Sequence, residues 1–366
     1  MKNKTSIISG VSGQDGSYLA EFLLDHDYRV FGLYRRTSNY NLSRIHHLLN
    51  NPQFKLIEFD LTDPASCNNV MKDIKPDEFY NLAAQSHVGT SFKQPTNTFH
   101  VNTMGVINIL EAIRDSSPAT KFYQASTSEM FGHNYDIDSA DGSKYQDELT
   151  AFFPQSPYGV SKLASHNMTR IYRDGYGVFG CCGILFNHES PRRGVDFVTR
   201  KITKWIGEYL HWCEKHAIRT DKTVSSEDNL YLVDVWSTDE ENKFPKLKLG
   251  NLSAKRDWGH AKDYVKAMWL MLQKDTPEDY IVATGVTKSV EDFLTEAFRY
   301  SSLGDFNNYT IIDKDLFRPA EVEYLRGSST KARVHLGWTP ETSFDELVHD
   351  MVDHDMVDHD RNNINV

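Results

Sequence analysis

Two clusters of reactive side chains lie near the middle of the chain. One is the pair Tyr158 and Lys162, and the other is Thr127 and Glu129. Helix positions four residues apart share one face, so an ammonium group can lie beside a phenol there. A phenol titrates near pH ~10, and a nearby ammonium favours the phenolate. Tyr158 is therefore a candidate general base for a hydroxyl group, although the spacing alone is more often that of an ordinary amphipathic helix.

The flanking sequence predicts where these side chains lie. Pro157 begins a helix that is expected to run to about Asp174, because the first helical position needs no N–H. Residues 121–125 form a buried strand, so Thr127 and Glu129 emerge at its carboxyl end, where open α/β sheets bind ligands. There Glu129 is a candidate to take a proton from carbon and pass it to a leaving hydroxyl. The alternative is a helix-capping carboxylate.

A glycine-rich segment follows the first predicted strand, Ser6 to Ser9. Gly10 permits a tight turn, Gly13 lets the backbone approach a pyrophosphate, and Gly16 allows the next helix to pack closely. This strand–loop–helix order predicts a dinucleotide site with the phosphates at the helix N-terminus. The predicted loop residues are Gly10, Ser12, Gly13, Gln14, Asp15 and Gly16.

The next predicted strand, Arg29 to Tyr34, ends in Arg35 and Arg36. A cofactor without a 2′-phosphate is usually met by an acid at this position. Two guanidinium groups suit a 2′-phosphate instead, because they form charge-assisted hydrogen bonds to it. The pair therefore favours NADP over NAD; the alternative is a solvated basic pair.

Strands and helices continue to alternate as far as Phe186, which predicts a doubly wound parallel sheet of the Rossmann type. The ends of the later strands supply further cofactor candidates, namely Asp60, Leu61, Leu82, Ala84 and Ser86. We divide the chain into a dinucleotide-binding domain at 1–186, a smaller C-terminal α/β substrate lobe at 187–350 that is interleaved with it, and a polar tail at 351–366.

Two segments look peripheral. Residues 220–246 contain many acids and few aliphatic residues, and we expect a surface excursion with a short strand at 230–233. Inward-facing acids would repel a diphosphate, so this segment is expected to be an outer flap or a subunit contact. At the C-terminus a five-residue sequence is repeated at 351–355 and 356–360, and its histidines fall on no single helical face. We interpret it as a polar tail without a metal site.

Composition limits the function classes. The chain has 366 residues, 39% hydrophobic and 25% charged, which is typical of a soluble globular protein. A net charge of -11 argues against nucleic-acid binding. The four cysteines have no metal-binding spacing and are expected to be reduced. Neither a signal peptide nor a run of about 20 apolar residues is present, so a cytoplasmic enzyme is expected.

With these motifs placed, the chain resembles the extended short-chain dehydrogenase/reductase superfamily and, within it, the GDP-mannose 4,6-dehydratases. The resemblance rests on segments that cover most of the chain: 10–19, 123–129, 187–194, 256–264 and 318–323. Sugar-nucleotide epimerases of this superfamily share the Tyr and Lys but usually lack an acid at the position of Glu129. Glu129 therefore favours dehydration.

The resemblance implies a hydro-lyase of deoxysugar biosynthesis that makes GDP-4-keto-6-deoxymannose, the precursor in the GDP-fucose pathway. Tyr158, helped by Lys162 and Thr127, would remove the C4 hydroxyl proton while hydride passes to NADP⁺. Glu129 would then take the C5 proton and assist loss of the C6 hydroxyl as water. Hydride would return to C6 from the same cofactor.

The resemblance also assigns binding residues and an assembly. Tyr158, Lys162, His188 and Arg193 would join the glycine loop and Arg35 around NADP. The sugar nucleotide would contact Ser86, Ser128, Asn187, Val198, Lys201, Arg256, Arg318 and Glu321. A homo-oligomer is implied, a dimer or a homotetramer built as a dimer of dimers, in which the Arg192-Arg193 loop reaches a neighbour's cofactor site.

The chain departs from the family at three places. Asn97 stands where a tyrosine is common, 220–246 looks like an insertion, and the segment before Phe317 looks short. The last two lie in the substrate lobe, so two alternatives stay open. One is the same chemistry on another GDP-sugar such as a GDP-heptose. The other is a non-catalytic NADP-binding regulator, against which the intact Thr127, Glu129, Tyr158 and Lys162 argue.

Overall fold

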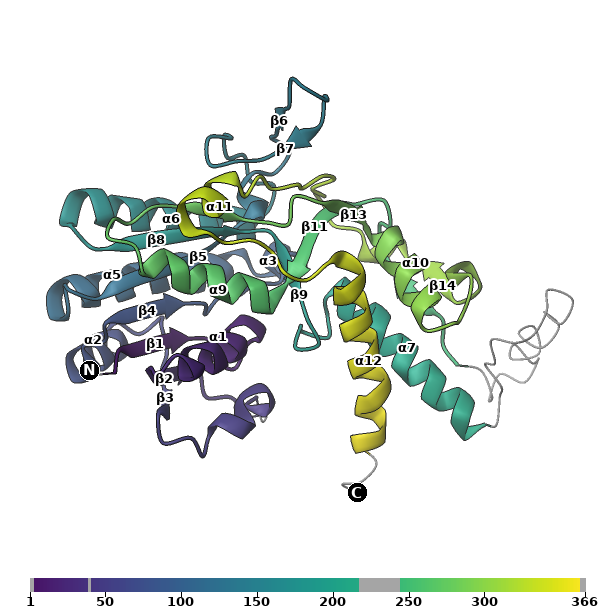
Figure 1. Ribbon diagram of the computed structural model, residues 1–366, viewed down its shortest axis with the longest axis horizontal. Helices are drawn as coiled ribbons and strands as arrows, with labels where there is room; N and C mark the ends of the chain where they lie inside the picture. Colours follow the sequence, from purple (N-terminus) through teal and green to yellow (C-terminus); the bar gives the residue numbers. More distant parts are fainter. Residues whose placement is uncertain (1–2, 39–40, 217–243, 363–366) are drawn as a thin grey trace, which may run out of the picture. The chain divides into compact units, whose positions relative to one another are not determined.

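A computed structural model describes residues 3–38, 41–216 and 244–362 (Figure 1). The chain forms two compact units, each built from three stretches of sequence. The first consists of Met1–Arg192, Lys255–Thr287 and Ala320–Thr342, and the second of Arg193–Ala254, Lys288–Pro319 and Ser343–Val366. Within the described ranges no helix has the length and apolar character needed to cross a membrane.

The first unit is built on a parallel sheet of seven strands in the order β3-β2-β1-β4-β5-β8-β12. This confirms the predicted doubly wound Rossmann-type sheet. The strands are β1 (Thr5–Ser9), β2 (Arg29–Tyr34), β3 (Phe54–Glu58), β4 (Glu78–Asn81), β5 (Lys121–Thr127), β8 (Gly180–Leu185) and β12 (Tyr280–Val282).

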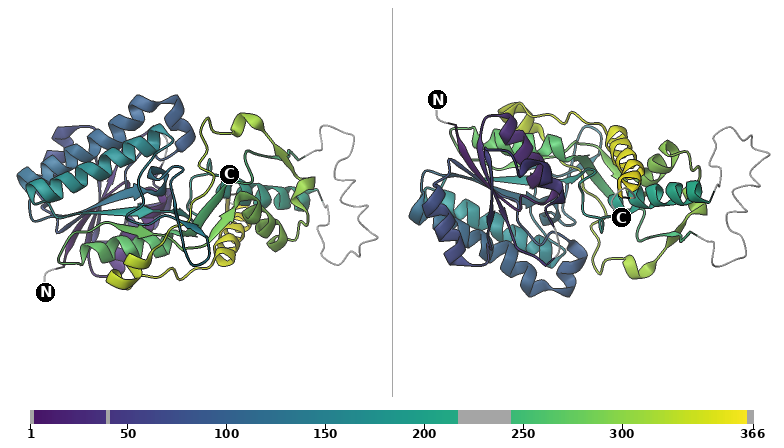
Figure 2. Two further views of the ribbon diagram at one scale, coloured as in Figure 1. Left: turned by 90° about the horizontal axis from the view of Figure 1, so that it is seen from above. Right: turned by 90° about the horizontal axis from the view of Figure 1, so that it is seen from below.

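Helices cover both faces of this sheet (Figure 2). Successive strand residues point to opposite faces. Accordingly Ile8 packs in one core with Leu19 and Met268, whereas Ile7 packs in the other with Ile109. The first face carries α1 (Gln14–Asp25) and α9 (Ala261–Leu272), and the second carries α2 (Pro64–Ile74), α5 (Gly105–Ser116) and α6 (Pro157–Tyr176).

Shorter elements complete the first unit. Strands β9 and β11 pair in parallel, and β6 and β7 form an antiparallel hairpin. Their bounds are β9 (Asn187–Glu189), β11 (Lys255–His260), β6 (Asp136–Ile137) and β7 (Lys144–Tyr145). The short helices are α3 (Val88–Lys93), α4 (Pro95–Phe99), α11 (Thr330–Leu336), the 3₁₀ turns η1 (Ser43–Leu48) and η3 (Ser128–Met130), and the π turn η2 (His100–Met104).

The second unit packs helices beside a small parallel sheet. Its elements are α7 (Val198–Lys215), α10 (Val290–Tyr300), α12 (Phe344–Asn362), β10 (Leu247–Leu249), β14 (Thr310–Ile312), and the 3₁₀ turns η5 (Phe306–Asn308) and η6 (Lys314–Leu316). Strand β13 (Thr287–Ser289) lies where the chain passes from the first unit to the second. In α12 the side chain of Asp355 is buried and contacts Arg200 and Thr203 of α7.

Two sequence predictions need correction here. Residues 351–362 are helical, and Met351, Val352 and Asp355 are buried, so the predicted polar tail is wrong at these three positions. Its histidines share no face, but Leu347, Val348, Met351 and Val352 form a buried stripe that the interpretation overlooked. The predicted boundary after residue 186 also differs, because the first unit extends to Arg192 and takes two later segments. The predicted excursion at 220–246, with its strand at 230–233, lies outside the described residues up to 243.

Candidate active site

The first turn of α6 holds Tyr158 against the end of β5. Ser156 caps the helix by accepting a hydrogen bond from the Gly159 N–H at 3.0 Å, and Pro157 follows as its first residue. A Cβ on Gly159 would lie 2.9 Å from the backbone oxygen of Glu129, so only glycine allows this approach. The buried Tyr158 is thereby placed beside the turn that carries Glu129.

Lys162 lies one helical turn after Tyr158 and is buried, with 5% exposure. Its Nζ donates to the backbone oxygen of Ala125 at 2.9 Å and lies 6.0 Å from the centre of the Tyr158 ring. Burial lowers the pKa of Lys162 to about 8, although the charge of Asp15 acts in the opposite direction. The ammonium therefore lies close enough to favour a phenolate at Tyr158, and its own charge is sensitive to alkaline pH.

Thr127 and Glu129 are positioned by the turn that follows β5. Thr127 is the last strand residue, and its Oγ1 accepts a hydrogen bond from the Glu129 N–H at 3.3 Å. Both side chains are buried, with 8% and 9% exposure. The structure thus brings together, within one unit, all four residues that the sequence singled out for chemistry.

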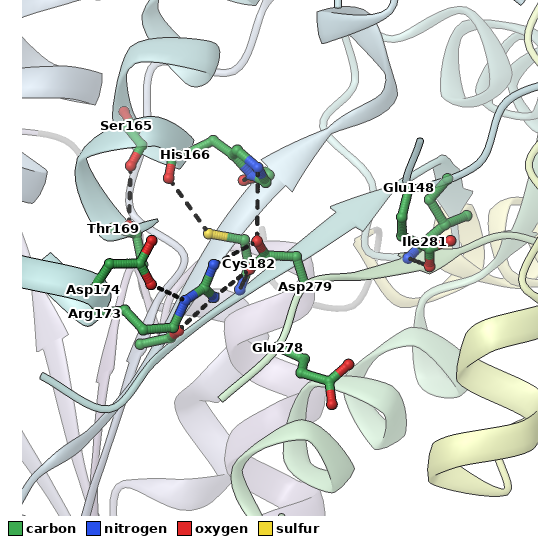
Figure 3. Close-up of polar contacts among 12 residues, drawn as sticks. Glu148, Ser165, His166, Thr169, Arg173, Asp174, Cys182, Glu278, Asp279 and Ile281 are labelled. Carbon is green, nitrogen blue, oxygen red and sulfur yellow. Dashed lines mark hydrogen bonds and ion pairs between the residues drawn. The ribbon is translucent and has the colours of Figure 1, made fainter. Parts of the chain in front are cut away.

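A polar cluster that the sequence did not predict fixes α6 along the sheet (Figure 3). Arg173 of α6 makes two hydrogen bonds of 2.9 Å to the carboxylate of Asp279. His166 contacts both this pair and β5: its Nε2 is 3.9 Å from Asp279, and its Nδ1 is 3.1 Å from the Oγ of Ser126. Burial lowers the pKa of His166, which keeps the imidazole neutral. Ser126 precedes Thr127, so the cluster joins α6 to the end of β5 that carries Thr127.

The glycine loop between β1 and α1 has the geometry expected of a phosphate-binding loop. Gly10 has φ +72°, and a Cβ there would lie 2.9 Å from the backbone nitrogen of Ala83. A Cβ on Gly16 would lie 2.4 Å from the Gly10 oxygen, so the helix packs directly on the turn. Helix α1 begins after Gly13 without a side-chain cap, which leaves its N-terminus suited to an anion.

The loop is joined to β9 by side chains of α1. Nε2 of His188 lies 2.8 Å from Oδ2 of Asp15, and Gln14 donates to the backbone oxygen of His188 at 3.1 Å. Ser190 donates to the Gln14 side-chain oxygen at 2.8 Å. Arg44, which the sequence analysis did not select, donates to the backbone oxygen of Ser12 at 3.3 Å. Two predicted cofactor residues, Asp15 and His188, therefore contact each other directly.

The edge of the sheet at β2 and β3 carries the predicted 2′-phosphate residues. Arg35 and Arg36 follow β2 and are exposed. Asp60 lies beyond β3, where hydrogen bonds from Thr62 and the charge of Arg35 lower its pKa despite the opposing effect of burial. Leu61 is buried, and a Cβ on Gly105 would lie 2.1 Å from its side chain.

The residues predicted to contact substrate divide between the two units. In the first unit, the buried Arg256 donates to Glu321 at 2.7 Å, so two predicted residues are ion-paired. Neighbouring Asp257 accepts hydrogen bonds from Thr284, Gly285 and Gly327, and burial raises the pKa of Asp257 to about 6. The first unit also contains Ser86, Ser128 and Asn187, whereas the second contains Val198, Lys201 and Arg318, and also the predicted cofactor residue Arg193.

The comparisons with known proteins decide the family. Residues 7–237 and 230–351 match the family model described as GDP-mannose 4,6 dehydratase. GDP-mannose 4,6 dehydratase 2 of Arabidopsis thaliana is 47% identical over 96% of this chain and 86% of that protein. GDP-mannose 4,6 dehydratase of Homo sapiens is 41% identical over 95% and 90%. This chain belongs to the GDP-mannose 4,6-dehydratase family.

The fold of this family member also resembles more distant sugar-nucleotide enzymes. A crystal structure of UDP-glucose 4-epimerase from Thermus thermophilus, in complex with NAD, aligns with a TM-score of 0.76. It is 21% identical and covers 96% of this chain and 98% of that one. The described residues contain no group of three or more His, Cys, Asp or Glu side chains arranged to hold a metal ion.

Proposed function

We propose that this protein catalyses the 4,6-dehydration of GDP-mannose to GDP-4-keto-6-deoxymannose. One observation carries the proposal. In a chain of this family, Glu129 follows β5 at a turn that packs directly against the first turn of α6, next to Tyr158. The matched family model and relatives favour this function over a GDP-heptose dehydratase or a non-catalytic regulator.

We assign different proton transfers to Tyr158 and Glu129. Tyr158, with the ammonium of Lys162 nearby and Thr127 at the end of β5, accepts the proton of the C4 hydroxyl. NADP supplies the hydride acceptor and donor for the reaction. A ketone at C4 makes the C5 proton acidic, and Glu129 takes that proton and transfers it to the departing C6 hydroxyl. The proton that Glu129 removes from carbon thus leaves with water, and the carboxylate is regenerated. Addition of hydride at C6 would require a proton at C5, and the C4 hydroxyl proton held by Tyr158 would balance it.

The residues around the glycine loop fit a dinucleotide. The uncapped N-terminus of α1 would receive the pyrophosphate, with the turn at Gly10 lying below it. Arg35 and Arg36 at the end of β2 would meet a 2′-phosphate, which is why we propose NADP and not NAD. The exposed position of both guanidinium groups leaves them accessible to such a ligand.

For the sugar nucleotide, we propose the contacts that the family resemblance implies. They are Ser86, Ser128, Asn187, Val198, Lys201, Arg256, Arg318 and Glu321. The three cationic side chains in this set suit a diphosphate, because Arg and Lys donate charge-assisted hydrogen bonds to phosphate oxygens.

A homo-oligomer is part of the proposal. Helix α4, turn η2 and the start of α6 line a surface hollow of about 770 Å³ whose apolar residues include Phe99, Met104 and Val160. These side chains are 40% to 47% exposed, and a second copy of the chain is the occupant that we propose. Arg192 is held inside the first unit by Glu21 and Ser17, so its proposed reach to a neighbour would require these contacts to open. Light scattering that shows an active monomer would contradict the oligomer.

Incubation of the purified protein with GDP-mannose tests the function. NMR of the product is expected to show a 4-ketone and a C6 methyl group, without added cofactor being consumed. The Tyr158→Phe variant is the matched control, because it keeps the ring and loses only the hydroxyl. Unchanged GDP-mannose with the native protein would refute the proposal.

A further inference from the structure

The first turn of α1 contains a carboxylate at the place where a bound pyrophosphate would lie. Asp15 is the second residue of the helix, and its side chain is 21% exposed. The partial positive charge of a helix N-terminus favours the ionised form of an acid in that turn. A carboxylate there also repels the phosphates that the same N-terminus attracts. A positive charge beside Asp15 therefore favours dinucleotide binding.

The two hydrogen-bond contacts of the His188 ring indicate that its imidazole provides this positive charge. Its Nδ1 lies 2.7 Å from the backbone oxygen of Phe186, and a carbonyl oxygen only accepts hydrogen bonds. Its Nε2 lies 2.8 Å from a carboxylate oxygen of Asp15, which also accepts when ionised. With Asp15 ionised, both ring nitrogens face acceptors, so a proton on each makes the contact one between an imidazolium and a carboxylate. The His188 side chain is 11% exposed, and its ring stacks on Tyr264 at 4.7 Å.

We infer that protonated His188 neutralises Asp15 and thereby sets the affinity of the glycine loop for the pyrophosphate of its dinucleotide. The inference rests on the dinucleotide binding that belongs to the proposed function. Loss of the His188 proton leaves a net negative charge in the first turn of α1. The affinity for the dinucleotide then falls, and by linkage a bound dinucleotide makes His188 hold its proton more tightly.

Other titratable groups near the pair behave differently. Burial, together with the charges of Asp257, Asp263 and Glu189, raises the pKa of Tyr264 well above its usual value, so its phenol stays neutral. Lys162 lies close enough to Asp15 to feel its charge and has a pKa of about 8. The native pH profile therefore includes Lys162 as well as His188. Variants of the pair are needed to separate the two.

The experiment is a fluorescence titration of the full-length protein with NADH and with NADPH, from about pH 6 to about pH 9, where imidazoles with carboxylate partners titrate. NADH lacks the 2′-phosphate, so ionisation of that group cannot produce its pH dependence. The proteins are the native chain, His188→Gln, Asp15→Asn and the double variant. His335→Gln is the matched control. His335 lies in α11, away from the glycine loop, and also faces a carboxylate, that of Glu278.

At pH 6, His188→Gln is expected to weaken binding of both dinucleotides by about two- to thirtyfold, the range for a full charge in a first helical turn. Adding Asp15→Asn should restore most of that affinity, since no carboxylate is left to offset. Asp15→Asn alone should reduce the pH dependence of dinucleotide affinity. If thermal unfolding shows that His188→Gln does not fold, Asp15→Asn still tests the inference. His335→Gln should match the native profile.

Native-like affinity and pH dependence in His188→Gln would overturn the inference. So would a double variant that binds as weakly as His188→Gln. If the native protein binds neither dinucleotide, both the proposed cofactor and the inference are wrong. If it binds both and the variants of Asp15 and His188 have no effect, only the inference is wrong.

Discussion

The two ends of the proposed dinucleotide site are built in different ways. At the catalytic end Tyr158, Lys162 and Glu129 are at most 9% exposed, and the α6 helix that carries two of them is fixed by the Arg173–Asp279 contact. At the edge beyond β2, Arg35 and Arg36 are exposed. Proton transfer needs atoms held at hydrogen-bond distance, whereas recognition of a phosphate needs mainly charge. Close packing is therefore concentrated at the end where we propose that proton transfer occurs.

The largest effect is expected at the catalytic end. Glu129→Gln cannot accept the C5 proton, so dehydration should slow by about 10²- to 10⁴-fold, the usual contribution of a general base. Oxidation at C4 does not use Glu129, so a single turnover should accumulate NADPH absorbance. Tyr158→Phe should give neither product nor NADPH. Dehydration by Glu129→Gln at a near-native rate would remove Glu129 from its proposed role.

At the exposed edge a smaller and more selective effect is expected. Arg35→Ala should weaken the binding of NADPH by roughly 1.5–3 kcal/mol, the value of a hydrogen bond to a charged group, and should change the binding of NADH much less. Arg29→Ala at the opposite end of β2 is the matched control and should change neither. Equal losses for both cofactors in Arg35→Ala would refute the 2′-phosphate assignment.

The contact that fixes α6 can be tested by stability. Asp279→Asn removes the largely buried carboxylate partner of Arg173 and leaves it the exposed Asp174 at 3.5 Å, so the unfolding free energy should fall by about 1–3 kcal/mol. Glu278→Gln is the control, because its contact with Lys331 is more exposed and should be worth less than about 1 kcal/mol. Urea unfolding measures both. Equal losses of unfolding free energy in the two variants would mean that the Arg173–Asp279 contact stabilises the protein no more than the exposed Glu278–Lys331 contact.

The buried lysine predicts a pH limit on turnover. Lys162 carries its charge below its pKa of about 8 and loses it above, so its support of the Tyr158 phenolate disappears as pH rises. The rate of C4 oxidation should therefore fall by about tenfold for each pH unit well above that value. A rate that is constant up to about pH 10 would show that the ammonium is not required.

Residues close in sequence made much of this structure predictable. The seven-stranded sheet follows from strands that alternate with helices, and the face shared by Tyr158 and Lys162 follows from their spacing behind Pro157. The contacts between Asp15 and His188, and between Arg173 and Asp279, join residues far apart in the chain. No local pattern specifies such pairs, because they form only when the sheet brings different strands and helices together.

The burial of residues in the C-terminal helix could not be predicted from local sequence either. The repeated histidines suggested a polar segment, but the buried stripe of α12 depends on which residues face α7. Asp355 belongs to that stripe because Arg200 and Thr203 of α7 satisfy its carboxylate. An acid next to apolar residues gives no sign of burial until its partner is known.

Isotope transfer tests the central claim most directly, that one chain oxidises C4 and reduces C6 of the same sugar. The native protein is supplied with GDP-mannose that carries deuterium at C4, and the product is analysed by NMR. The account predicts that the deuterium appears in the C6 methyl group, because the hydride removed from C4 returns within one active site. Loss of the label from the product, or steady accumulation of reduced cofactor, would contradict the account.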